Sequence, residues 1–444
     1  MSNIKPRLLK GFRDYLPEQM ILRSRAMQAI RGVFESFGFV PLDTPTLEYA
    51  EILLGKYGAD AEKLLYKFAD NGGRDVCMRY DLTVPLARVV AQYPDLVKPF
   101  KRYQMAPVWR GENTGKGRYR EFVQCDVDIV GTKSLLADFE CIWVGHNVMK
   151  ALGVQRFRIH VSHRKLLEGL STLLGEGLTR GQVLEVFRTV DKLPSQGRER
   201  VEQLLAEEVG LTADQIQTVF RFLDISGEVE DVLARLDVLF ADVPLAREGI
   251  ADLRETFGYA RQAGLDMSRL GLDLTIARGL DYYTGAVFET FLEDLPSIGS
   301  VMSGGRYDGL IGFFAKQDIP AVGISVGLDR LFSGMEELGI MKPQSATAEV
   351  LLTLFDKTLM PRYLELAARL RAAGIPTELY YQTDSLGKQL QFADRRGIPL
   401  AIIMGESEAA QGVVGIKVLA EKRQETVPLD QLETRLRELM ATSR

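Results

Sequence analysis

The stretch from Phe100 to Gly131 carries the side chains whose types and spacing could do chemistry. Its ends have the apolar composition of buried strands. Its middle, Arg110–Arg120, is a glycine-containing turn with four Arg or Lys residues and Glu112. Because an arginine presents a planar fork of donors that matches phosphate oxygens, this turn could bind a triphosphate without a P-loop. A basic surface hairpin is the other interpretation.

The strand expected after this turn predicts a polar pocket. Side chains alternate between the two faces of a strand, so an aromatic ring, an amide and two carboxylates fall on one face. They are Phe122, Gln124, Asp126 and Asp128. Such a set is poor material for a core. It would suit an adenine stack beside a pocket for a cationic or hydrogen-bonding substrate.

Composition indicates an ordinary globular protein with more than one domain. The 444 residues exceed the roughly 250–300 that a single core usually holds. Hydrophobic residues make up 46% and charged residues 26%, as in soluble globular proteins. The net charge of −5 gives no global attraction to nucleic acid, so any RNA contact must come from local basic patches.

Cysteine and histidine spacing argues against a disulfide framework and against a metal centre. The three cysteines are odd in number and show no CxxC spacing, and none of the three histidines lies in an HExxH motif. The N-terminal stretch lacks a signal-peptide core, and no apolar run reaches about 18 residues. We therefore expect no metal site, no membrane association and a reduced, cytoplasmic location.

The elements that must position the opening stretch follow from hydrophobic periodicity. A helix is expected over residues 18–37, and Gly38 ends it. Residues 39–48 form a strand broken by two prolines, which predicts a sheet edge or an interface because proline cannot donate to a ladder. Further expected elements are strands at 66–70, 76–80 and 157–161 and helices at 86–92 and 138–152.

Asp81 and Thr83 stand just before the helix expected at residues 86–92. Short polar side chains at that position ordinarily cap the helix, so capping is one interpretation of both residues. A role in ligand binding is the other.

From residue 162 to about 270 the pattern becomes helical, which predicts an insertion of roughly 100 residues between two halves of a β-rich core. The helices are expected at 164–174, 181–190, 197–209, 214–223, 228–239 and 246–263. Strands return at 272–277 and 287–292. Glycine-dense residues 301–309 indicate close backbone approach inside a sheet rather than a dinucleotide loop. Arg330 lies at a strand-to-helix junction, where it could bind phosphate or form a surface ion pair.

The C-terminal part predicts a separate small α/β domain with a parallel sheet. Residues 339–347 are a polar linker, and strands and helices alternate after it. The strands are expected at 349–354, 377–381, 400–404 and 412–418, and the helices at 361–373, 385–395 and 429–440.

Several strings resemble the histidyl-tRNA synthetase family of class II aminoacyl-tRNA synthetases, over almost the whole chain. The long helix with GFVPLDTPTLE resembles motif one, the dimer-forming segment. The opening stretch resembles motif two, and VGISVGLDRL resembles motif three. MRYDLTVPLAR and ARGLDYYTGAVFE resemble the signatures particular to the histidine enzyme. GKQLQFADRRG and GESEAAQGVVGIKVL match the anticodon-binding domain of the family.

The resemblance implies an α+β catalytic core on an antiparallel sheet with a helical insertion, followed by a small C-terminal α/β anticodon-binding domain. The core would comprise residues 1–161 and 271–338, the insertion 162–270, and the anticodon-binding domain 348–444. The activity would be ATP-dependent attachment of L-histidine to tRNA(His) through histidyl-adenylate. The protein would be a homodimer through motif one, and Mg²⁺ would accompany ATP.

The resemblance also implies a role for each site residue. Arg110 and Arg278 would be catalytic, standing on two sides of the α-phosphate, with Arg110 also orienting the histidine carboxylate. The ATP-binding residues would be Arg110, Glu112, Arg118, Phe122 and Arg330. The histidine-binding residues would be Asp81, Leu82, Thr83, Arg110, Gln124, Asp128, Arg278, Tyr282 and Tyr283. The tRNA acceptor end would meet the hairpin tip at Asn113, Thr114 and Lys116. Asp126 receives no role.

Two departures from the family pattern stand out. Asp128 occupies a position where many bacterial members carry Glu, and the hairpin tip lacks the Arg and Gln that many of them present to the acceptor end. An alternative function is that of a non-catalytic paralogue, the regulatory subunit of ATP phosphoribosyltransferase. Such proteins usually lose the ATP-binding arginines and the C-terminal domain, which this chain keeps. A synthetase-like domain that senses uncharged tRNA is a further alternative, although no kinase motif accompanies it.

Overall fold

The structure is a computed structural model that describes residues 4–56, 62–175, 178–190, 192–276, 283–315, 317–341 and 345–442. The chain forms two compact units. One unit contains residues 1–13 and 26–340, and the other contains residues 14–25 and 341–444. Within the described ranges, no helix has the length and apolar character needed to cross a membrane.

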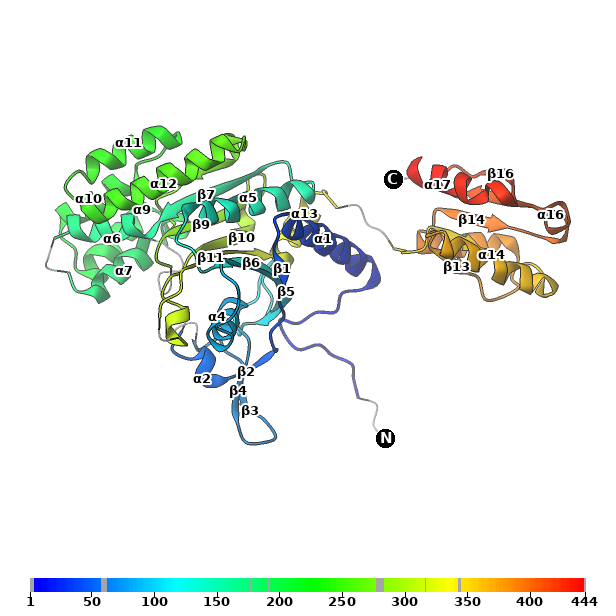
Figure 1. Ribbon diagram of the computed structural model, residues 1–444, viewed down its shortest axis with the longest axis horizontal. Helices are drawn as coiled ribbons and strands as arrows, with labels where there is room; N and C mark the ends of the chain where they lie inside the picture. The colour runs from blue at the N-terminus through cyan, green and yellow to red at the C-terminus, as the bar shows by residue number, and fades with distance from the viewer. Residues whose placement is uncertain are drawn as a thin grey trace. The chain divides into compact units, whose positions relative to one another are not determined.

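As far as the described residues show, the first unit is built on an eight-stranded sheet (Figure 1). In spatial order the strands are β1 (Val40–Pro41), β5 (Phe100–Trp109), β6 (Glu121–Val130), β11 (Ala321–Gly327), β10 (Met302–Arg306), β9 (Ala286–Leu292), β7 (Phe157–His163) and β8 (Leu270–Leu272). All neighbours from β5 to β7 are antiparallel, whereas β1 and β8 join the two edges in parallel. The antiparallel core is therefore confirmed. The pairing of β6 with β11 joins parts of the chain that the insertion separates.

The proline-bearing segment lies at a sheet edge, as the sequence predicted. Pro41 belongs to β1, the outermost strand beside β5. The chain then enters a smaller sheet of β2 (Leu47–Tyr49), β4 (Asp75–Met78) and β3 (Lys67–Ala69), all antiparallel. The two strands expected at 66–70 and 76–80 are thus confirmed, and they pair with each other.

Helices cover both faces of the large sheet. In the first unit outside the insertion they are α2 (Ala50–Leu53), α4 (Thr83–Gln92), α5 (Leu135–Ala151) and α13 (Leu328–Glu337), with short 3-10 turns η3 (Pro296–Ile298) and η4 (Ile311–Phe313). Helix α1 (Pro17–Ser36) contributes its residues from Ala26 onward to this unit. Successive residues of β11 face opposite layers. Ala321 lies in the core around α4, and Ile324 packs beside Gly145 of α5. Figure 1 shows α4 and α5 on opposite sides of the sheet.

The predicted helical segment forms between β7 and β8. Its elements are α6 (Arg164–Leu173), α7 (Arg180–Val190), α8 (Leu193–Gln196), α9 (Arg198–Leu204), η1 (Leu205–Val209), α10 (Ala213–Leu223), α11 (Val229–Leu239), α12 (Pro244–Gln262) and η2 (Met267–Arg269). Local chemistry sets some boundaries: Thr212 and Gln215 form a reciprocal capping box that starts α10. Helix α12 packs on α5, α6 and β7 and so joins the insertion to the core.

One strand of the core was misplaced. The sequence predicted a strand over 272–277, but β8 ends at Leu272. The carboxylate of Asp273 accepts the backbone N–H of Thr275 at 2.9 Å, and this local turn ends the strand. Ala277 lies outside the described residues.

The second unit contains a sheet in the order β13 (Thr377–Leu379), β12 (Val350–Leu352), β14 (Leu400–Ile403), β15 (Val413–Val418) and β16 (Arg423–Pro428). Its helices are α14 (Met360–Ala372), α15 (Leu386–Arg396), α16 (Glu406–Gln411) and α17 (Leu432–Thr442), with 3-10 turns η5 (Lys357–Leu359) and η6 (Leu429–Gln431). The prediction of a parallel sheet is wrong for β15 and β16, which are antiparallel to their neighbours. The connection at residues 404–412 is too short for a parallel crossover, which needs about a dozen residues.

Candidate active site

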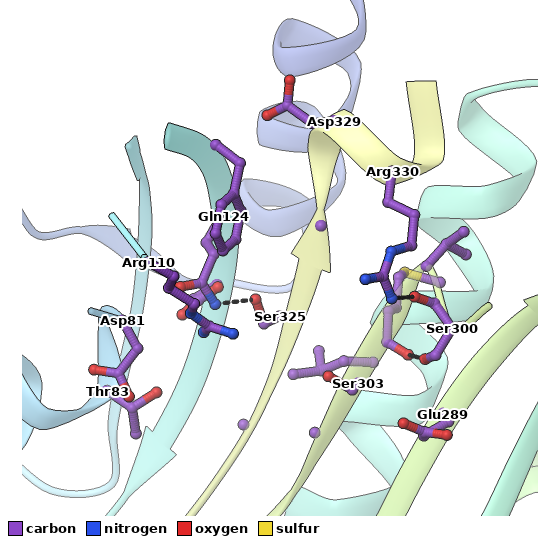
Figure 2. Close-up of a pocket in the computed structure, with 18 of the residues that line it drawn as sticks. Asp81, Thr83, Arg110, Gln124, Glu289, Ser300, Ser303, Ser325, Asp329 and Arg330 are labelled. Atoms are coloured by element: carbon purple, nitrogen blue, oxygen red, sulfur yellow. Dashed lines mark hydrogen bonds between the residues drawn. The ribbon is translucent and has the colours of Figure 1, made fainter. Parts of the chain in front are cut away.

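A cavity of about 310 Å³ lies over β6, β11 and β10 and is closed at one end by the β5–β6 hairpin (Figure 2). Ten of the predicted site residues line it: Asp81, Thr83, Arg110, Glu112, Arg118, Phe122, Gln124, Asp128, Tyr283 and Arg330. Polar residues that the sequence did not assign line it too: Tyr119, Asp126, Glu289, Ser300, Ser303, Tyr307, Ser325 and Asp329. The fold therefore brings the two halves of the core into one cavity.

Four other predicted residues, all described, do not line the cavity. Leu82 is buried beneath the cavity, and its carbonyl accepts a hydrogen bond from Arg102 NH2 at 3.0 Å. The hairpin-tip residues Asn113, Thr114 and Lys116 are absent from the lining, and Lys116 forms an ion pair with Glu337 of α13. Arg278 and Tyr282 lie outside the described residues.

The hairpin positions Arg110 by stacking and by a backbone contact. Its guanidinium lies 4.3 Å from the ring centroid of Tyr80 and 5.2 Å from that of Phe122. Its Nε donates to the carbonyl of Tyr80 at 3.1 Å. Glu112 lies between two cations, 3.9 Å from Arg110 NH1 and 3.3 Å from Arg118 Nε. Two guanidinium groups around one carboxylate leave a net positive charge, which suits an anionic ligand.

Arg330 enters the cavity from the start of α13. Its NH1 donates to the carbonyl of Ser300 at 2.8 Å, and Figure 2 shows both residues across β11 from Arg110. The preceding Asp329 accepts the backbone N–H of Val123 at 2.8 Å, which fastens α13 to β6. Gly117 of the hairpin has a φ of +64°, and a Cβ there would lie 3.1 Å from Cα of Arg330. A glycine at 117 thus lets the hairpin approach α13.

Asp81 and Thr83 lie at the start of α4 and also line the cavity. Asp81 Oδ1 accepts the backbone N–H of Val84 at 3.1 Å, so the capping interpretation is correct for Asp81. Thr83 is the first residue of α4. Both side chains also line the cavity, and capping therefore does not exclude a role in binding.

Asp128 lies farther from the hairpin on the polar face of β6, and a protein group lies close to each of its oxygens. Oδ1 accepts the hydroxyl of Tyr307, and Oδ2 lies 2.8 Å from Arg102 NH2 in an ion pair that lacks hydrogen-bond alignment. Burial raises the pKa of Asp128, while the charge of Arg102 opposes that rise. Gly323 is its neighbour on β11, and a Cβ there would lie 2.0 Å from Oδ1. Only glycine leaves room for this carboxylate.

Gln124 and Asp126 present acceptors that the protein leaves unused. Gln124 Nε2 donates to Ser325 Oγ at 2.7 Å, and Ser325 is hydrogen-bonded to Asp126. Within the described ranges, the buried atoms Gln124 Oε1 and Asp126 Oδ1 have no hydrogen-bond partner. Burial raises the pKa of Asp126 to about 7, although the charge of Arg102 acts against it.

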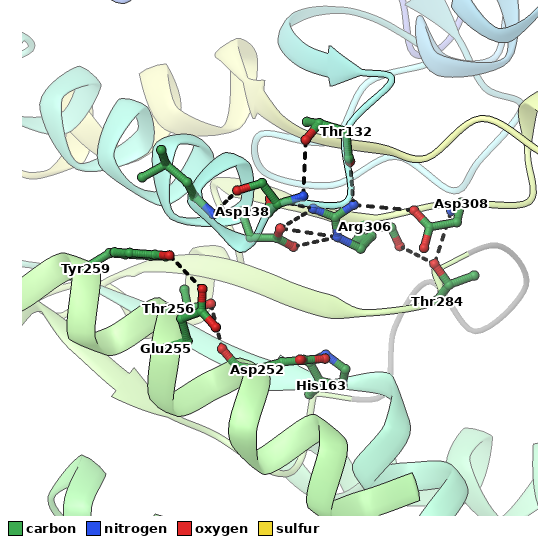
Figure 3. Close-up of polar contacts among 12 residues, drawn as sticks. Thr132, Asp138, His163, Asp252, Glu255, Thr256, Tyr259, Thr284, Arg306 and Asp308 are labelled. Carbon is green, nitrogen blue, oxygen red and sulfur yellow. Dashed lines mark hydrogen bonds and ion pairs between the residues drawn. The ribbon is translucent and has the colours of Figure 1, made fainter. Parts of the chain in front are cut away.

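A buried ion pair supports the segment that carries Tyr283. Arg306 of β10 pairs with Asp138 of α5, and Figure 3 shows how it also reaches Thr132. The carbonyl of Arg306 accepts the backbone N–H of Thr284 at 2.8 Å. The segment after residue 282 is thereby tied to both β10 and α5.

Sequence reasoning missed Arg102, Tyr307 and Ser325 because only strand register brings them to Asp126 and Asp128. The sequence did contain one indication of these contacts, which is a charged residue within a strand expected to be buried. Arg102 stands inside a strand of otherwise buried composition, and a buried arginine requires a buried anion.

Comparison with known proteins identifies the family. The histidyl-tRNA synthetase family profile matches residues 11–331, and the anticodon binding domain profile matches residues 348–439. A histidine–tRNA ligase of Rhodopirellula baltica is 48% identical over 425 residues, covering 96% of each chain. One from Wolinella succinogenes is 41% identical, covering 93% of this chain and 94% of its own. The crystal structure of a histidyl-tRNA synthetase from Nostoc sp. PCC 7120 superposes with a TM-score of 0.90 at 33% identity, covering 98% of this chain and 100% of that one.

The antiparallel core, its cavity and the separate α/β unit are those of a class II aminoacyl-tRNA synthetase, an aminoacyl-tRNA ligase. Within that class, the chain belongs to the histidyl-tRNA synthetase family.

Proposed function

We propose that the protein attaches L-histidine to tRNA(His) in two steps. The histidine carboxylate attacks the α-phosphate of ATP, which gives histidyl-adenylate and pyrophosphate. A hydroxyl at the 3′ end of the tRNA then takes the histidyl group and releases AMP. One observation carries the proposal: a single cavity combines a cationic end with a buried polar floor of carboxylates and amide.

ATP would lie at the cationic end. Arg118 and Arg330 would hold the β- and γ-phosphates, and Phe122 and Arg330 would sandwich adenine while Glu112 reads its amino edge. The exposure of half of the Arg118 side chain supports this role, because the side chain can close on a ligand that enters from solvent. Mg²⁺ would enter with the phosphates, whose oxygens and water are its usual ligands. Glu112, which faces two arginines, does not compete for it.

Arg110 and Arg278 would carry the chemistry. Arg110 would bridge the histidine carboxylate and the α-phosphate, so that the two reactants meet in line. Its stacking between Tyr80 and Phe122 fixes the guanidinium before the ligands arrive. Arg278 would stabilise the charge that develops on the α-phosphate.

Histidine would lie along β6. Asp81, Thr83 and Gln124 would bind its α-amino group, Leu82 would contribute through the same segment, and Asp128 would act at the imidazole end. Tyr282 and Tyr283 would close this part of the cavity. A buried polar site rejects amino acids that leave its hydrogen-bonding groups unpaired.

The remaining assignments concern partners and organisation. The unit that matches the anticodon-binding domain would bind the tRNA anticodon, and Asn113, Thr114 and Lys116 would meet the acceptor end. Two copies would pair through the motif-one segment at residues 18–48, in the cytoplasm. Domains would divide at residues 1–161, 162–270, 271–338 and 348–444, with a linker at 339–347.

The regulatory-subunit alternative is less well supported. Relatives that match almost the whole chain are named histidine–tRNA ligases. The chain also keeps Arg110, Arg118 and Arg330 in the cavity, together with the C-terminal unit that such subunits usually lack.

Histidine-dependent ATP–pyrophosphate exchange tests the proposal. The parent protein is expected to exchange only when L-histidine is present. Arg110→Ala and Arg278→Ala should each lower kcat by roughly two to three orders of magnitude, the usual loss of an electrostatic contact to the reacting group. Absence of exchange in the parent would overturn the enzymatic proposal. Full exchange in either variant would overturn the role of that arginine alone.

A further inference from the structure

Asp126 is a buried carboxylate in the cavity to which no role is assigned. Gln124, Asp126 and Asp128 follow one another on the same face of β6, about 6.6 Å apart at each step. Arg110 stands beyond Gln124, at the hairpin end. A histidine whose carboxylate faces Arg110 therefore extends its side chain along the strand, over Asp126 before Asp128.

The two aspartates differ in how the protein uses them. At Asp128, Oδ1 accepts the hydroxyl of Tyr307, and Oδ2 lies 2.8 Å from Arg102 NH2 in an ion pair without a hydrogen bond. Asp126 is only 2% exposed, yet its Oδ1 has no hydrogen-bond partner in the described part of the chain. Leaving a buried carboxylate oxygen without a donor is costly, so a donor from a ligand would stabilise it.

The surroundings of Asp126 fix its orientation. Ser325 accepts the amide N–H of Gln124 and is hydrogen-bonded to Asp126, which joins the three side chains in a row. On the other side, Arg102 is the one cation that acts on both Asp126 and Asp128 among the described residues. One positive charge does not balance two ionised carboxylates, and the remaining negative charge favours a ligand N–H.

We infer that Asp126 is a specificity-determining residue, whose Oδ1 accepts a hydrogen bond from an imidazole N–H of bound histidine, with Asp128 next to it at the imidazole end of the cavity. The inference deepens the proposed function and rests on it. A side chain without a ring N–H leaves Oδ1 unpaired, and the site discriminates against it for that reason.

The test compares Asp126→Asn and Asp126→Ala with the parent in ATP–pyrophosphate exchange. Asp126→Ala should raise KM for histidine roughly ten- to a hundredfold, the loss expected for a hydrogen bond to a charged group, with KM for ATP within about twofold. Asp126→Asn keeps an acceptor oxygen, so its KM for histidine should lie between those of the parent and Asp126→Ala. Val127→Ala is the matched control, because Val127 is buried on the opposite face of the same strand.

An analogue separates binding from a structural role. In a thiazole analogue of histidine, sulfur replaces a ring N–H and removes the donor, with a small increase in ring size. The parent should prefer histidine over the analogue, as substrate or as competitive inhibitor, by a ratio that falls roughly tenfold or more in Asp126→Ala. An unchanged ratio, or a histidine KM that moves no more than in Val127→Ala, would overturn the inference and leave the proposed function standing.

Failure of the proposed function gives a different pattern. The parent would then show no histidine-dependent exchange at all. Calorimetric titration of L-histidine into the parent and Asp126→Ala decides the inference in that case. Weaker binding to the variant supports the hydrogen bond, and equal binding or no binding to the parent overturns it.

Discussion

The guanidinium of Arg102 is the positive charge that acts on two buried carboxylates of the cavity, Asp126 and Asp128. Arg102 is fully buried, and the β5–β6 register places it opposite Asp128 and one step from Asp126. Because Asp128 takes the direct ion pair, Asp126 receives less compensation for its burial. Burial therefore outweighs the charge of Arg102 and raises the pKa of Asp126 to about 7.

Asp126→Asn should therefore become more stable relative to the parent as pH rises. The folded-state pKa of about 7 lies above the ordinary value of 3.8, so the folded protein keeps a proton that the unfolded chain loses. The stability tied to that proton is present below about pH 4 and is lost towards pH 7, at about 1.4 kcal/mol per pKa unit. Asparagine does not titrate.

Thermal unfolding of parent and variant between pH 4 and 8 checks this prediction. The groups that face Asp126 are Arg102 and Gln104 of β5, Asp128, Ser325 of β11 and Asp81. The difference in melting temperature should move in favour of the variant up to about pH 7 and then remain constant. A difference that is the same at every pH would contradict it.

At this scale, alternation along one strand was enough to predict part of the site. Phe122, Gln124, Asp126 and Asp128 all line the cavity, as the period of two required. The sequence could not show that Tyr307 binds Asp128, because that contact depends on the register of strands from distant parts of the chain. The inference about Asp126 depends on that same contact.

At the scale of elements, predictions succeeded where local chemistry sets the boundary. The helix expected from Glu18 begins at Pro17, and the strand after Arg120 begins at Glu121. Predictions failed where pairing with a neighbouring strand decides whether a segment is a strand and where it ends. The edge strand β16 reads RQETVP, which has no clear apolar alternation, and only its ladder with β15 makes it a strand.

Asp138→Ala should destabilise the first unit by about 3–5 kcal/mol. Its carboxylate is fully buried and pairs with Arg306, whose NH1 and NH2 also donate to the carbonyls of Thr132 and Ser134 at 3.0 and 3.1 Å. Removing one partner leaves a buried charge uncompensated, which is the costly way to break such a pair. The ion pair joins α5 to β10, so the loss falls on the element that supports Tyr283.

Urea unfolding followed by tryptophan fluorescence measures this loss. Both tryptophans of the chain, Trp109 and Trp143, lie in the first unit, so the signal reports on that unit alone. Leu136→Ala is the control, because Leu136 lies on the same helix and is 53% exposed. It should change the free energy of unfolding by no more than about 0.5 kcal/mol. A loss below about 1 kcal/mol in Asp138→Ala would refute the supporting role.

At the scale of the whole molecule, the chain has two separately packed units and a negative net charge. Each unit has its own core: the second unit packs Val350, Leu400 and Leu436 in one cluster, and the first packs around the large sheet. The net charge of −5 opposes a general attraction to a polyanion. Under the proposed function, binding of tRNA would then depend on exposed cations, whereas histidine and ATP would meet charges enclosed in the cavity.

The salt dependence of the two half-reactions should differ for that reason. Neutralising several phosphates releases counterions, so KM for tRNA in aminoacylation should rise at least about tenfold between 50 and 200 mM KCl. KM for histidine in ATP–pyrophosphate exchange should change less than about twofold at constant Mg²⁺, because enclosed charges are screened less than exposed ones. Equal rises in both constants would contradict this separation.

Lys116→Ala adds a local form of the same prediction. Its side chain is 61% exposed at the hairpin tip, and its ion pair with Glu337 is open to solvent. If it contacts one tRNA phosphate, its loss should weaken tRNA binding and reduce the slope of log KM against log salt by about 1. Lys150→Ala, at the exposed end of α5, is the matched control and should leave the slope unchanged. The same slope in both variants would exclude a phosphate contact at the tip. Acceptor recognition would then have to come from other cations of the chain.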